Sequence, residues 1–544
     1  MKLRFKFLAI PVLALAGAIL LANGSGYFEI SKNLDIFISL YKKVDELYVD
    51  EIDHSKVMRK GIDAMLSELD PYTVYFSESE VEDFKFQRTG TYAGIGARIV
   101  EHGEDLVIDE IYEGGPALDA GLVAGDVMLE IDGKSLDGKS VSEMSEILKG
   151  EENTLVKIKY KRSGKENEVE FKRAEVKVDN VSYSGMLTQD VGYVKFENFR
   201  MDAAKEVKEK MDDLKQQGMT KFVLDMRGNP GGLLKEAVDI VNLFVDANNL
   251  VVSTKGKNKN HTREYKTYKR PYDEEIPIVV LVDGGSASAS EIVSGSLQDY
   301  DRGVVIGRNS FGKGLVQITQ PLTYNAQLKV TTSKYYTASG RCIQRLDYAS
   351  RDVDGNVPAV PDSLITEFKT MAGRTVFDGA GINPDIEVKS ETRSPFIRGL
   401  INDHLIFDFA TEFYYQHESI AAPSDFELSD ADLSSFKSYI VSNDFKYETK
   451  TEKKLDQLKK GLSGDDSLKV ANEIDELRGF LNSLKSDDFD ADKETIKELL
   501  RLEILERYYY RRGKAEGALD NDADVKKAIE VLNNATLYSN TLKP

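Results

Sequence analysis

Cysteine and histidine are scarce in this chain, and each scarcity excludes a kind of site. The single cysteine, Cys342, rules out a disulfide within the chain, and a lone thiol of this kind is most often a buried structural side chain. The sequence predicts no metal site and no organic cofactor. The spacing of the histidines alone does not exclude a catalytic histidine triad, but nothing else in the sequence supports one. The five histidines are scattered and form no motif: His54, His102, His261, His404 and His417.

Positive charge is also in short supply. The 72 lysines and arginines are outnumbered by 92 aspartates and glutamates, which gives a formal net charge of −20. Because nucleic acid binding needs a basic surface facing the phosphates, we predict no nucleic acid partner. The hydrophobic share of 41% and charged share of 30% are those of an ordinary globular protein. The chain is too long for one core, so we expect about three or four domains.

The N-terminus has the pattern of an export signal. Basic residues precede an apolar run over residues 7–22, and small polar residues follow at 23–26. This pattern is typical of a secretory signal, and the run is short for a membrane span of about 20 apolar residues. No cysteine follows it, which excludes a lipoprotein anchor. We expect an exported protein, periplasmic or associated with the cell envelope. Residues 1–24 would be a signal peptide or, alternatively, an uncleaved membrane anchor that tethers the chain.

The pattern of residue types divides the rest of the chain into four further segments. Residues 25–86 show the spacing of amphipathic helices, and residues 87–175 hold short strands and glycine turns. Residues 176–394 alternate strands and helices, which predicts an α/β core in a multidomain protein; residues 345–379 within them look like an insertion of unassigned role. Residues 395–544 predict helices whose apolar stripes are packing faces. The helices at either end are candidates for forming a homo-oligomer.

An ordered series of glycine turns marks the second of these segments. It begins with Gly94-Ile95-Gly96 before a strand. The glycines alone would only form turns, but in their order they resemble a PDZ domain. The resemblance implies that the N–H groups of Gly94, Ile95 and Gly96 bind a free C-terminal carboxylate while the peptide adds as a strand. The later turns are Gly114-Gly115-Pro116-Ala117, Ala120-Gly121-Leu122, Gly125-Asp126-Val127 and Ile131-Asp132-Gly133.

A serine-rich stretch, Ser286 to Glu291, follows an apolar strand and a Gly284-Gly285 turn. Its central residue, Ser288, would begin a helix that runs to about Tyr300. Unpaired N–H groups and the positive end of the helix favour developing negative charge at that place. Taken alone, a serine there is more often a helix cap than a nucleophile. Its chemistry depends on a base nearby.

Lys313 lies between two glycines in the stretch Phe311 to Gln317. Because burial disfavours the ammonium form, a buried lysine is a candidate general base. We predict a strand on which Lys313 and Gln317 share a face. The neutral Gln317 amide would then orient the amine without the negative charge that keeps it protonated. A phosphate-binding loop is disfavoured because the Gly-x-x-x-x-Gly-Lys-Ser/Thr pattern is missing.

A second glycine turn is a source of the donors that acyl transfer needs at a developing oxyanion. The turn follows Asp225, between a predicted buried strand and a helix. The N–H group of Gly231 or Gly232 would supply one donor, and that of Ala289 the other. Considered alone, these glycines are explained equally well by simple turn geometry.

In their order, the motifs resemble those of the C-terminal processing peptidases, also called tail-specific proteases. The resemblance covers residues 27–388 and implies a crotonase-like β/α protease core with an inserted PDZ domain, between an N-terminal helical segment and a mostly helical C-terminal extension. The stretches that carry it are Leu69-Asp70-Pro71-Tyr72, Gly94-x-Gly96, Asp225-x-Arg227-x-Asn229-Pro230-Gly231-Gly232, Ser286 to Glu291, Phe311 to Gln317 and Gly381-Ile382-Asn383-Pro384-Asp385.

For the site, the resemblance implies Ser288 as nucleophile, Lys313 as general base and Gln317 as the partner that positions it. It also implies the oxyanion donors just described and a structural role for Glu291. The expected protein is an exported serine endopeptidase that captures protein substrates by free, apolar C-termini and cleaves upstream of them.

Two other functions compete with this one. A non-catalytic PDZ adaptor with a relic protease core is one, and the intact Ser288, Lys313 and Gln317 argue against it. A crotonase-type enzyme acting on acyl-CoA is the other. The export signal and the PDZ segment argue against that alternative.

Overall fold

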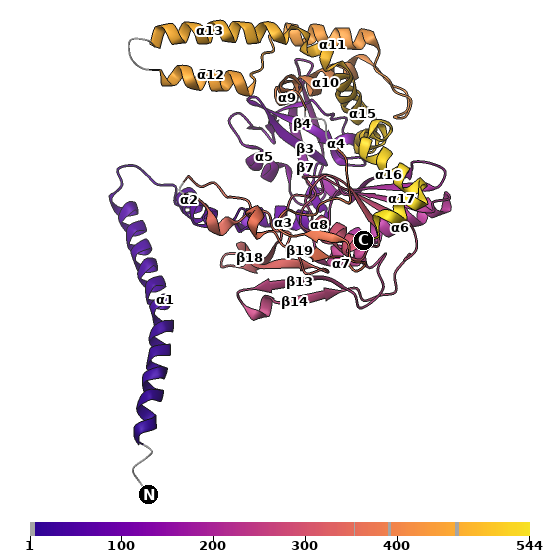
Figure 1. Cartoon of the computed structure of the whole chain (residues 1–544). Coiled ribbons are helices and arrows are strands. Elements are labelled where there is room, and N and C mark those ends of the chain that lie inside the picture. Colours follow the sequence, from indigo (N-terminus) through magenta and orange to yellow (C-terminus); the bar gives the residue numbers. More distant parts are fainter. Residues whose placement is uncertain (1–5, 353, 390–392, 463–466) are drawn as a thin grey trace. The chain divides into compact units, whose positions relative to one another are not determined.

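The computed structural model describes residues 6–352, 354–389, 393–462 and 467–544. The chain divides into two compact units between Tyr75 and Phe76, and Figure 1 shows the elements of each. The division falls within the short strand β1 (Val74–Phe76). All residues predicted for the site belong to the second unit.

The first unit contains two helices, α1 (Lys6–Leu47) and α2 (His54–Ser67). α1 continues through residues 23–26, where the sequence predicts a polar exit from an apolar run; the basic Lys2 and Arg4 lie outside the described residues. Asp53 fixes the start of α2, because its side chain accepts a 2.9 Å hydrogen bond from the N–H of Lys56. Among the described residues, no helix combines the length and the apolarity that crossing a membrane requires.

The second unit begins with the 3₁₀ turn η1 (Glu78–Glu80) and a short helix, α3 (Val81–Thr89), which lead into a β-rich module. Its strands β3, β4, β5, β7 and β8 form an antiparallel sheet with β6 added to β5, and β2 pairs with β9 where the chain enters and leaves. The module comprises β2 (Thr91–Gly94), β3 (Ala97–His102), β4 (Asp105–Ile111), α4 (Pro116–Asp119), β5 (Val127–Ile131), β6 (Lys134–Ser135), α5 (Val141–Leu148), β7 (Leu155–Arg162), β8 (Lys165–Lys172) and β9 (Ala174–Lys177).

The central sheet has the order β10-β11-β12-β15-β16-β21, and all its neighbours from β11 to β21 are parallel. Helices connect its strands, as the alternating pattern of the sequence predicts. The elements are β10 (Val181–Met186), β11 (Val191–Phe196), α6 (Ala203–Gln216), β12 (Lys221–Asp225), α7 (Leu234–Val241), β15 (Ile278–Val282), α8 (Ala289–Asp299), β16 (Val304–Gly307) and β21 (Ile386–Glu387).

Both faces of this sheet are covered, which explains why β15 is apolar at every position. On one face Phe222 and Leu224 pack in a core shared with α6, α7 and α8. On the other face Val223 packs with Val525 and Val531 of α16 (Ala523–Asn533). A helix from the far C-terminus therefore completes the core.

A second sheet, which the sequence pattern mostly does not reveal, lies beside the first. Its antiparallel pairs are β17 with β18, β18 with β13 and β13 with β14. Figure 1 shows β13, β14 and β18 side by side. The elements are β13 (Leu250–Gly256), η2 (Lys259–His261), β14 (Arg263–Lys266), β17 (Leu315–Pro321) and β18 (Gln327–Thr337).

The segment at 345–379 is anchored to the core. Its strands β19 and β20 form a small antiparallel hairpin, and Arg374 between them contacts Asp301 (2.6 Å) and Asp385 (2.5 Å). Its elements are η3 (Tyr348–Ser350), η4 (Asp362–Leu364), β19 (Glu367–Lys369) and β20 (Thr375–Phe377).

The C-terminal extension is helical and has its own apolar core, to which Leu400, Phe436 and Ile496 contribute. Helices α12 and α13 lie side by side (Figure 1), with Lys459 and Asp475 paired at 2.6 Å. The helices are α9 (Pro395–Asn402), α10 (Leu405–Gln416), α11 (Asp430–Ser442), α12 (Lys450–Gly461), α13 (Ser467–Ser483), η5 (Leu484–Asp487), α14 (Asp488–Ala491), α15 (Lys493–Ala518), η6 (Leu519–Asn521), α16 and α17 (Ala535–Thr541).

The extension also contacts the rest of the second unit through buried charges. Arg511 on α15 donates to Glu110 of the β-rich module at 2.8 Å. Asp524 at the start of α16 accepts from Arg227 at 2.8 Å and from Arg308 at 3.1 Å. Because Arg227 lies in the turn predicted to hold oxyanion donors, its contact with Asp524 means that α16 helps to fix this turn.

Candidate active site

Ser288 is the N-cap residue of α8. Its φ of 55° and ψ of −110° lie in a region that side chains other than glycine rarely adopt. The neighbouring loop surrounds it closely: a Cβ built on Gly231 would lie 2.9 Å from the Ser288 Cβ and 2.6 Å from the Ala287 carbonyl oxygen. Ser288 thus has the position of a helix cap, but capping alone does not require its strain. Backbone strain of this kind is concentrated at functional sites.

The carboxylate of Glu291 connects Ser288 to the lysine loop. It is completely buried and accepts hydrogen bonds from the N–H groups of Ser288 (2.8 Å), Gly312 (2.7 Å) and Lys313 (2.9 Å). The Ser310 hydroxyl is a fourth donor. Burial raises the pKa of Glu291, and the four donors oppose that rise because they favour the ionised form. One side chain therefore fixes the backbone of both predicted catalytic residues.

Lys313 lies in the loop before β17, which begins at Leu315. The prediction of one strand carrying Lys313 and Gln317 on a shared face is therefore wrong. The reason is that the N–H groups of this loop pair with side chains: Glu291 accepts from the N–H of Lys313, and Gln344 accepts from that of Gly314 at 2.7 Å. Lys313 and Gln317 nevertheless line the same pocket.

That pocket has a volume of about 470 Å³, and we call it the catalytic pocket. The pairing of β17 with β18 shifts in register between Val316 and Gln317, and this shift lets both of these neighbouring residues line the pocket. The Gln317 amide donates to the Thr331 hydroxyl at 3.1 Å. The predicted residues that line the pocket are Ser288, Lys313, Gln317, Ala289, Gly231 and Gly232; apolar lining comes from Leu233, Leu234, Ile292, Leu315, Val316 and Tyr335.

The two glycines predicted as alternative oxyanion donors differ in the structure. The N–H of Gly231 is already used, because it donates to the Asn229 side-chain oxygen at 2.9 Å. Within the described part of the chain, the N–H groups of Gly232 and Ala289 make no hydrogen bond. Gly232 must be glycine, since φ is 154° and a Cβ would lie 2.4 Å from the Phe199 carbonyl oxygen. The geometry therefore favours Gly232 and Ala289.

Asn229, which the sequence analysis included in a motif without a role, joins this turn to the serine loop. Its carbonyl oxygen accepts from the N–H of Ala287 (3.0 Å) and from the Ser290 hydroxyl (2.9 Å). Its side chain donates to the Phe196 carbonyl at 2.9 Å and orders Gly231. These contacts hold the second glycine turn against Ser288.

A second pocket of about 230 Å³ lies between β3 and α5 of the β-rich module, and we call it the tail groove. Of the three residues predicted to bind a peptide tail, Ile95 lines the groove while Gly94 and Gly96 flank it in the same turn. Gly96 has a φ of 78°, and a Cβ there would approach Gly115 to 2.9 Å, so glycine is required.

Tyr92 occupies the mouth of the predicted carboxylate-binding turn. It lines the tail groove, and its ring crosses Gly94 so closely that a Cβ there would lie 2.5 Å from a ring carbon. Burial raises the pKa of Tyr92, and the N–H groups of Gly96 and Ala97, which face the phenol oxygen, oppose that rise. Of the three residues predicted to bind a tail carboxylate, Gly96 is thus the one whose N–H already interacts with an oxygen of the protein.

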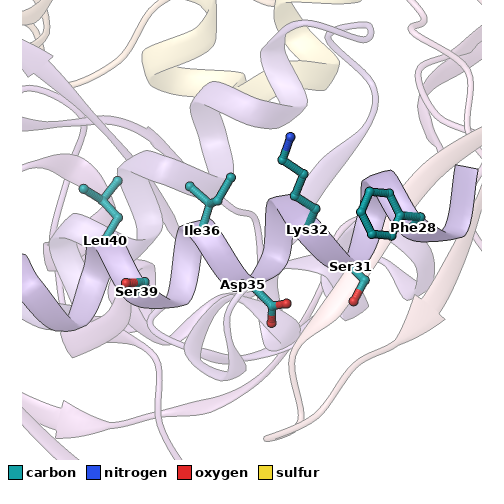
Figure 2. A pocket seen from close by; sticks show the side chains of 7 residues that line it. All are labelled: Phe28, Ser31, Lys32, Asp35, Ile36, Ser39 and Leu40. Atoms are coloured by element: carbon teal, nitrogen blue, oxygen red, sulfur yellow. The ribbon is translucent and has the colours of Figure 1, made fainter. Parts of the chain in front are cut away.

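A hollow of about 660 Å³ on the first unit is a weaker candidate. Its seven lining residues all come from α1, and Figure 2 shows Lys32, Ile36 and Leu40 projecting from one side of that helix and Asp35 from the other. No second element brings a further group to it. It is the open flank of one helix, and it offers no convergent chemistry.

Comparison with known families agrees with this layout. Residues 190–352 match "Peptidase family S41", residues 107–162 match "PDZ domain", and residues 396–532 match "Probable PDZ-protease, C-terminal helical domain". The catalytic pocket lies mainly in the first match, and the tail groove is lined in equal parts by residues within the second match and by residues just before it.

Curated relatives give the same assignment. A "Carboxy-terminal-processing protease" of Bartonella bacilliformis is 33% identical over 347 residues, which cover 62% of this chain and 78% of the relative. A "Probable CtpA-like serine protease" of Staphylococcus aureus is 35% identical over 315 residues, covering 57% and 62%. Among solved structures, a photosystem II D1 C-terminal processing protease matches with 25% identity, coverage of 67% and 94%, and a TM-score of 0.36.

The fold and the site define a mixed α/β multidomain serine peptidase with a PDZ domain, N-terminal helices and a helical C-terminal domain. The chain belongs to peptidase family S41, as a protease of the carboxy-terminal-processing type. Its PDZ domain indicates that the substrates are proteins.

We predict that Glu291→Gln lowers kcat about a hundredfold, the scale expected when reacting groups are misplaced by about 1 Å. In the native protein, three backbone N–H groups donate to the two carboxylate oxygens of Glu291. In the variant, the amide NH₂ group would replace one of these oxygens and face N–H groups that need an acceptor. Steady-state cleavage of a peptide substrate measures the effect. Glu236→Gln is the control, because Glu236 is also buried but accepts from Ala204 outside the pocket. Equal losses in both variants would mean general damage to the fold.

We also predict that Tyr92→Phe tightens the binding of a peptide with a free apolar C-terminus about fivefold. Removing the phenol oxygen frees the N–H groups of Gly96 and Ala97 for the peptide, a gain on the scale of about one hydrogen bond. Calorimetric titration on a Ser288→Ala background, in which cleavage should not occur, measures the affinity. Tyr160→Phe, in the core of the same module, should leave it unchanged. Weaker binding by Tyr92→Phe would show that the phenol assists the tail instead.

Proposed function

We propose that this protein hydrolyses peptide bonds with a Ser288–Lys313 dyad. The observation that carries the proposal is the convergence of Ser288, Lys313, Gly232 and Ala289 on one pocket. No carboxylate among the described residues lines that pocket. A general base must present a neutral amine when the serine attacks, and the proposal assigns that form to Lys313 at this step.

In the proposed reaction, the Ser288 hydroxyl oxygen attacks the scissile carbonyl carbon while the Lys313 amine takes its proton. The carbonyl oxygen becomes an oxyanion and accepts hydrogen bonds from the N–H groups of Gly232 and Ala289. When the tetrahedral intermediate collapses, the carbon–nitrogen bond breaks and Lys313 returns the proton to the leaving amine. Water then attacks the acyl-enzyme carbonyl carbon while Lys313 takes its proton. As this second intermediate collapses, the bond between that carbon and the Ser288 oxygen breaks, and Lys313 returns the proton to the Ser288 oxygen. Gln317, held by Thr331, would shape the wall beside Lys313.

We further propose that the tail groove selects substrates by their free C-termini, of apolar character, and that this selection is coupled to cleavage. Apolar side chains such as Ile99, Met144 and Leu148 line the groove, which suits an apolar terminal residue. Helix α3 supports the coupling because it contributes to both pockets. Phe86 lines the tail groove, while Phe84 lines the catalytic pocket. A tail that moves Phe86 would therefore move a wall of the catalytic pocket.

Export is the remaining part of the proposed function. The basic start, the apolar run at 7–22 and the polar residues at 23–26 support it. The protein would then act in the periplasm or at the cell envelope, either released or tethered by its N-terminus.

We expect Ser288→Ala and Lys313→Met each to lower kcat/KM by at least about a thousandfold, the scale of losing one member of a catalytic unit. Cleavage of a folded protein with an apolar C-terminus, followed by mass spectrometry, is the measurement. Lys334→Met, an exposed lysine on β18, is the control. Both inactive variants should still bind the tail peptide. A Ser288→Ala protein that still cleaves would rule out the proposed nucleophile, and a wild-type protein that binds tails without cleaving would favour the adaptor.

We expect residues 1–26, fused to a reporter enzyme that matures only outside the cytoplasm, to activate that reporter in a bacterial host. Replacing Leu13 and Leu15 with arginine interrupts the apolar run and should abolish the signal, because export signals need an uninterrupted apolar core. Reporter activity with and without this change is the measurement. Activity that survives the arginines, or none with the native segment, would contradict export by this signal.

A further inference from the structure

The catalytic pocket has a one-sided charge. Four cationic side chains line it, from Arg88, Arg200, Lys313 and Lys329, and no carboxylate of the described residues does. This is unexpected in a chain whose net charge is −20. A positive cleft in a negative protein concentrates anionic groups at that place.

Among these cations, Lys329 is the one whose charge the surrounding protein compensates least. It lies on β18, opposite Thr319 of β17, and is half-buried. In the described structure it makes no ion pair, hydrogen bond or ring contact. Burial alone lowers the pKa of Lys329, and no neighbouring charge contributes to that shift. A desolvated, unpaired ammonium is costly, and the binding of a carboxylate beside it would offset that cost.

The two arginines differ from Lys329 because the protein holds each in place. Arg200 donates to the Val178 carbonyl oxygen at 3.3 Å and lies over the ring of Phe86 at 5.0 Å. Arg88 lies over the ring of Phe84 at 5.9 Å. Neither carries a carboxylate partner among the described residues. They therefore add a fixed positive field, while the mobile stem of Lys329 is able to follow a ligand.

We propose that Lys329 forms a subsite that binds an acidic side chain of the substrate near the scissile bond, with Arg88 and Arg200 contributing the surrounding field. The subsite rests on the proposed function, because it presumes that a peptide chain passes Ser288. The tail carboxylate is a different group, since the proposed function places it in the tail groove, which does not include Lys329. An Asp or Glu within the chain is the substrate chemistry that fits.

The test uses peptides that share one free apolar C-terminus and differ only by Glu, Gln or Lys at successive positions on either side of the scissile bond. We expect wild-type enzyme to prefer Glu at one position by about tenfold in kcat/KM, the scale of one charge-assisted hydrogen bond. Lys329→Met should bring that Glu/Gln ratio close to one. Lys329→Glu should reverse it, so that Lys is preferred at the same position.

The matched control is Lys334→Met, on the same strand but exposed and outside the pocket, which should keep both activity and ratio. A wild-type enzyme that cleaves the peptides without any Glu preference would overturn the subsite and leave the protease intact. A preference that survives Lys329→Met would overturn the role of Lys329, provided circular dichroism shows a folded variant. Failure to cleave any peptide or protein would count against the proposed function itself.

Discussion

The buried carboxylate of Glu291 is the contact on which the site depends. It accepts hydrogen bonds from the N–H groups of both Ser288 and Lys313, so one side chain sets the position of the helix that begins at Ser288 and of the lysine loop. A buried carboxylate is stable only when its lone pairs are satisfied, and here four donors do so. The same contacts that stabilise the charge therefore order the proposed catalytic groups.

The support continues outward through the glycine turn and the C-terminal helices. Asn229 joins that turn to the serine loop, and Arg227 within the turn pairs with buried Asp225 and with Asp524 of α16. The positive neighbours Arg227 and Lys195 hold the pKa of Asp225 well below its usual range, against the effect of its burial. A helix whose Asp524 lies 297 residues from Arg227 in the chain thus helps to hold the turn predicted to supply oxyanion donors.

Much of the fold could be predicted from the sequence where local patterns are strong. The apolar run Ile278–Val282 predicts a buried strand, and the helix after Ser288 lies where its cap and glycine turn place it. The same reasoning failed at Lys313, because alternation was used to infer a strand where Glu291 and Gln344 hold the backbone instead. Strands β13 and β14 were missed because β13 turns polar after Val252, β14 is mostly charged, and β13 pairs on its other side with β18, far along the chain. Long-range partners of this kind leave no periodic signal.

The sequence by itself determined which chemical groups are available: the serine, the lysine, the paired glycines and the ordered motifs that identify the family. Their order and spacing are local properties, and short-range sterics and turn preferences express them directly. Only the tertiary structure decided which groups meet. It showed that, among the described residues, the N–H of Gly231 is already hydrogen-bonded while that of Gly232 is not. It also placed Tyr92 in the tail groove, beside the turn predicted to bind a tail carboxylate, and Lys329 in the catalytic pocket. These choices depend on contacts between residues far apart in the chain, where burial and hydrogen-bond competition, not spacing, select the partner.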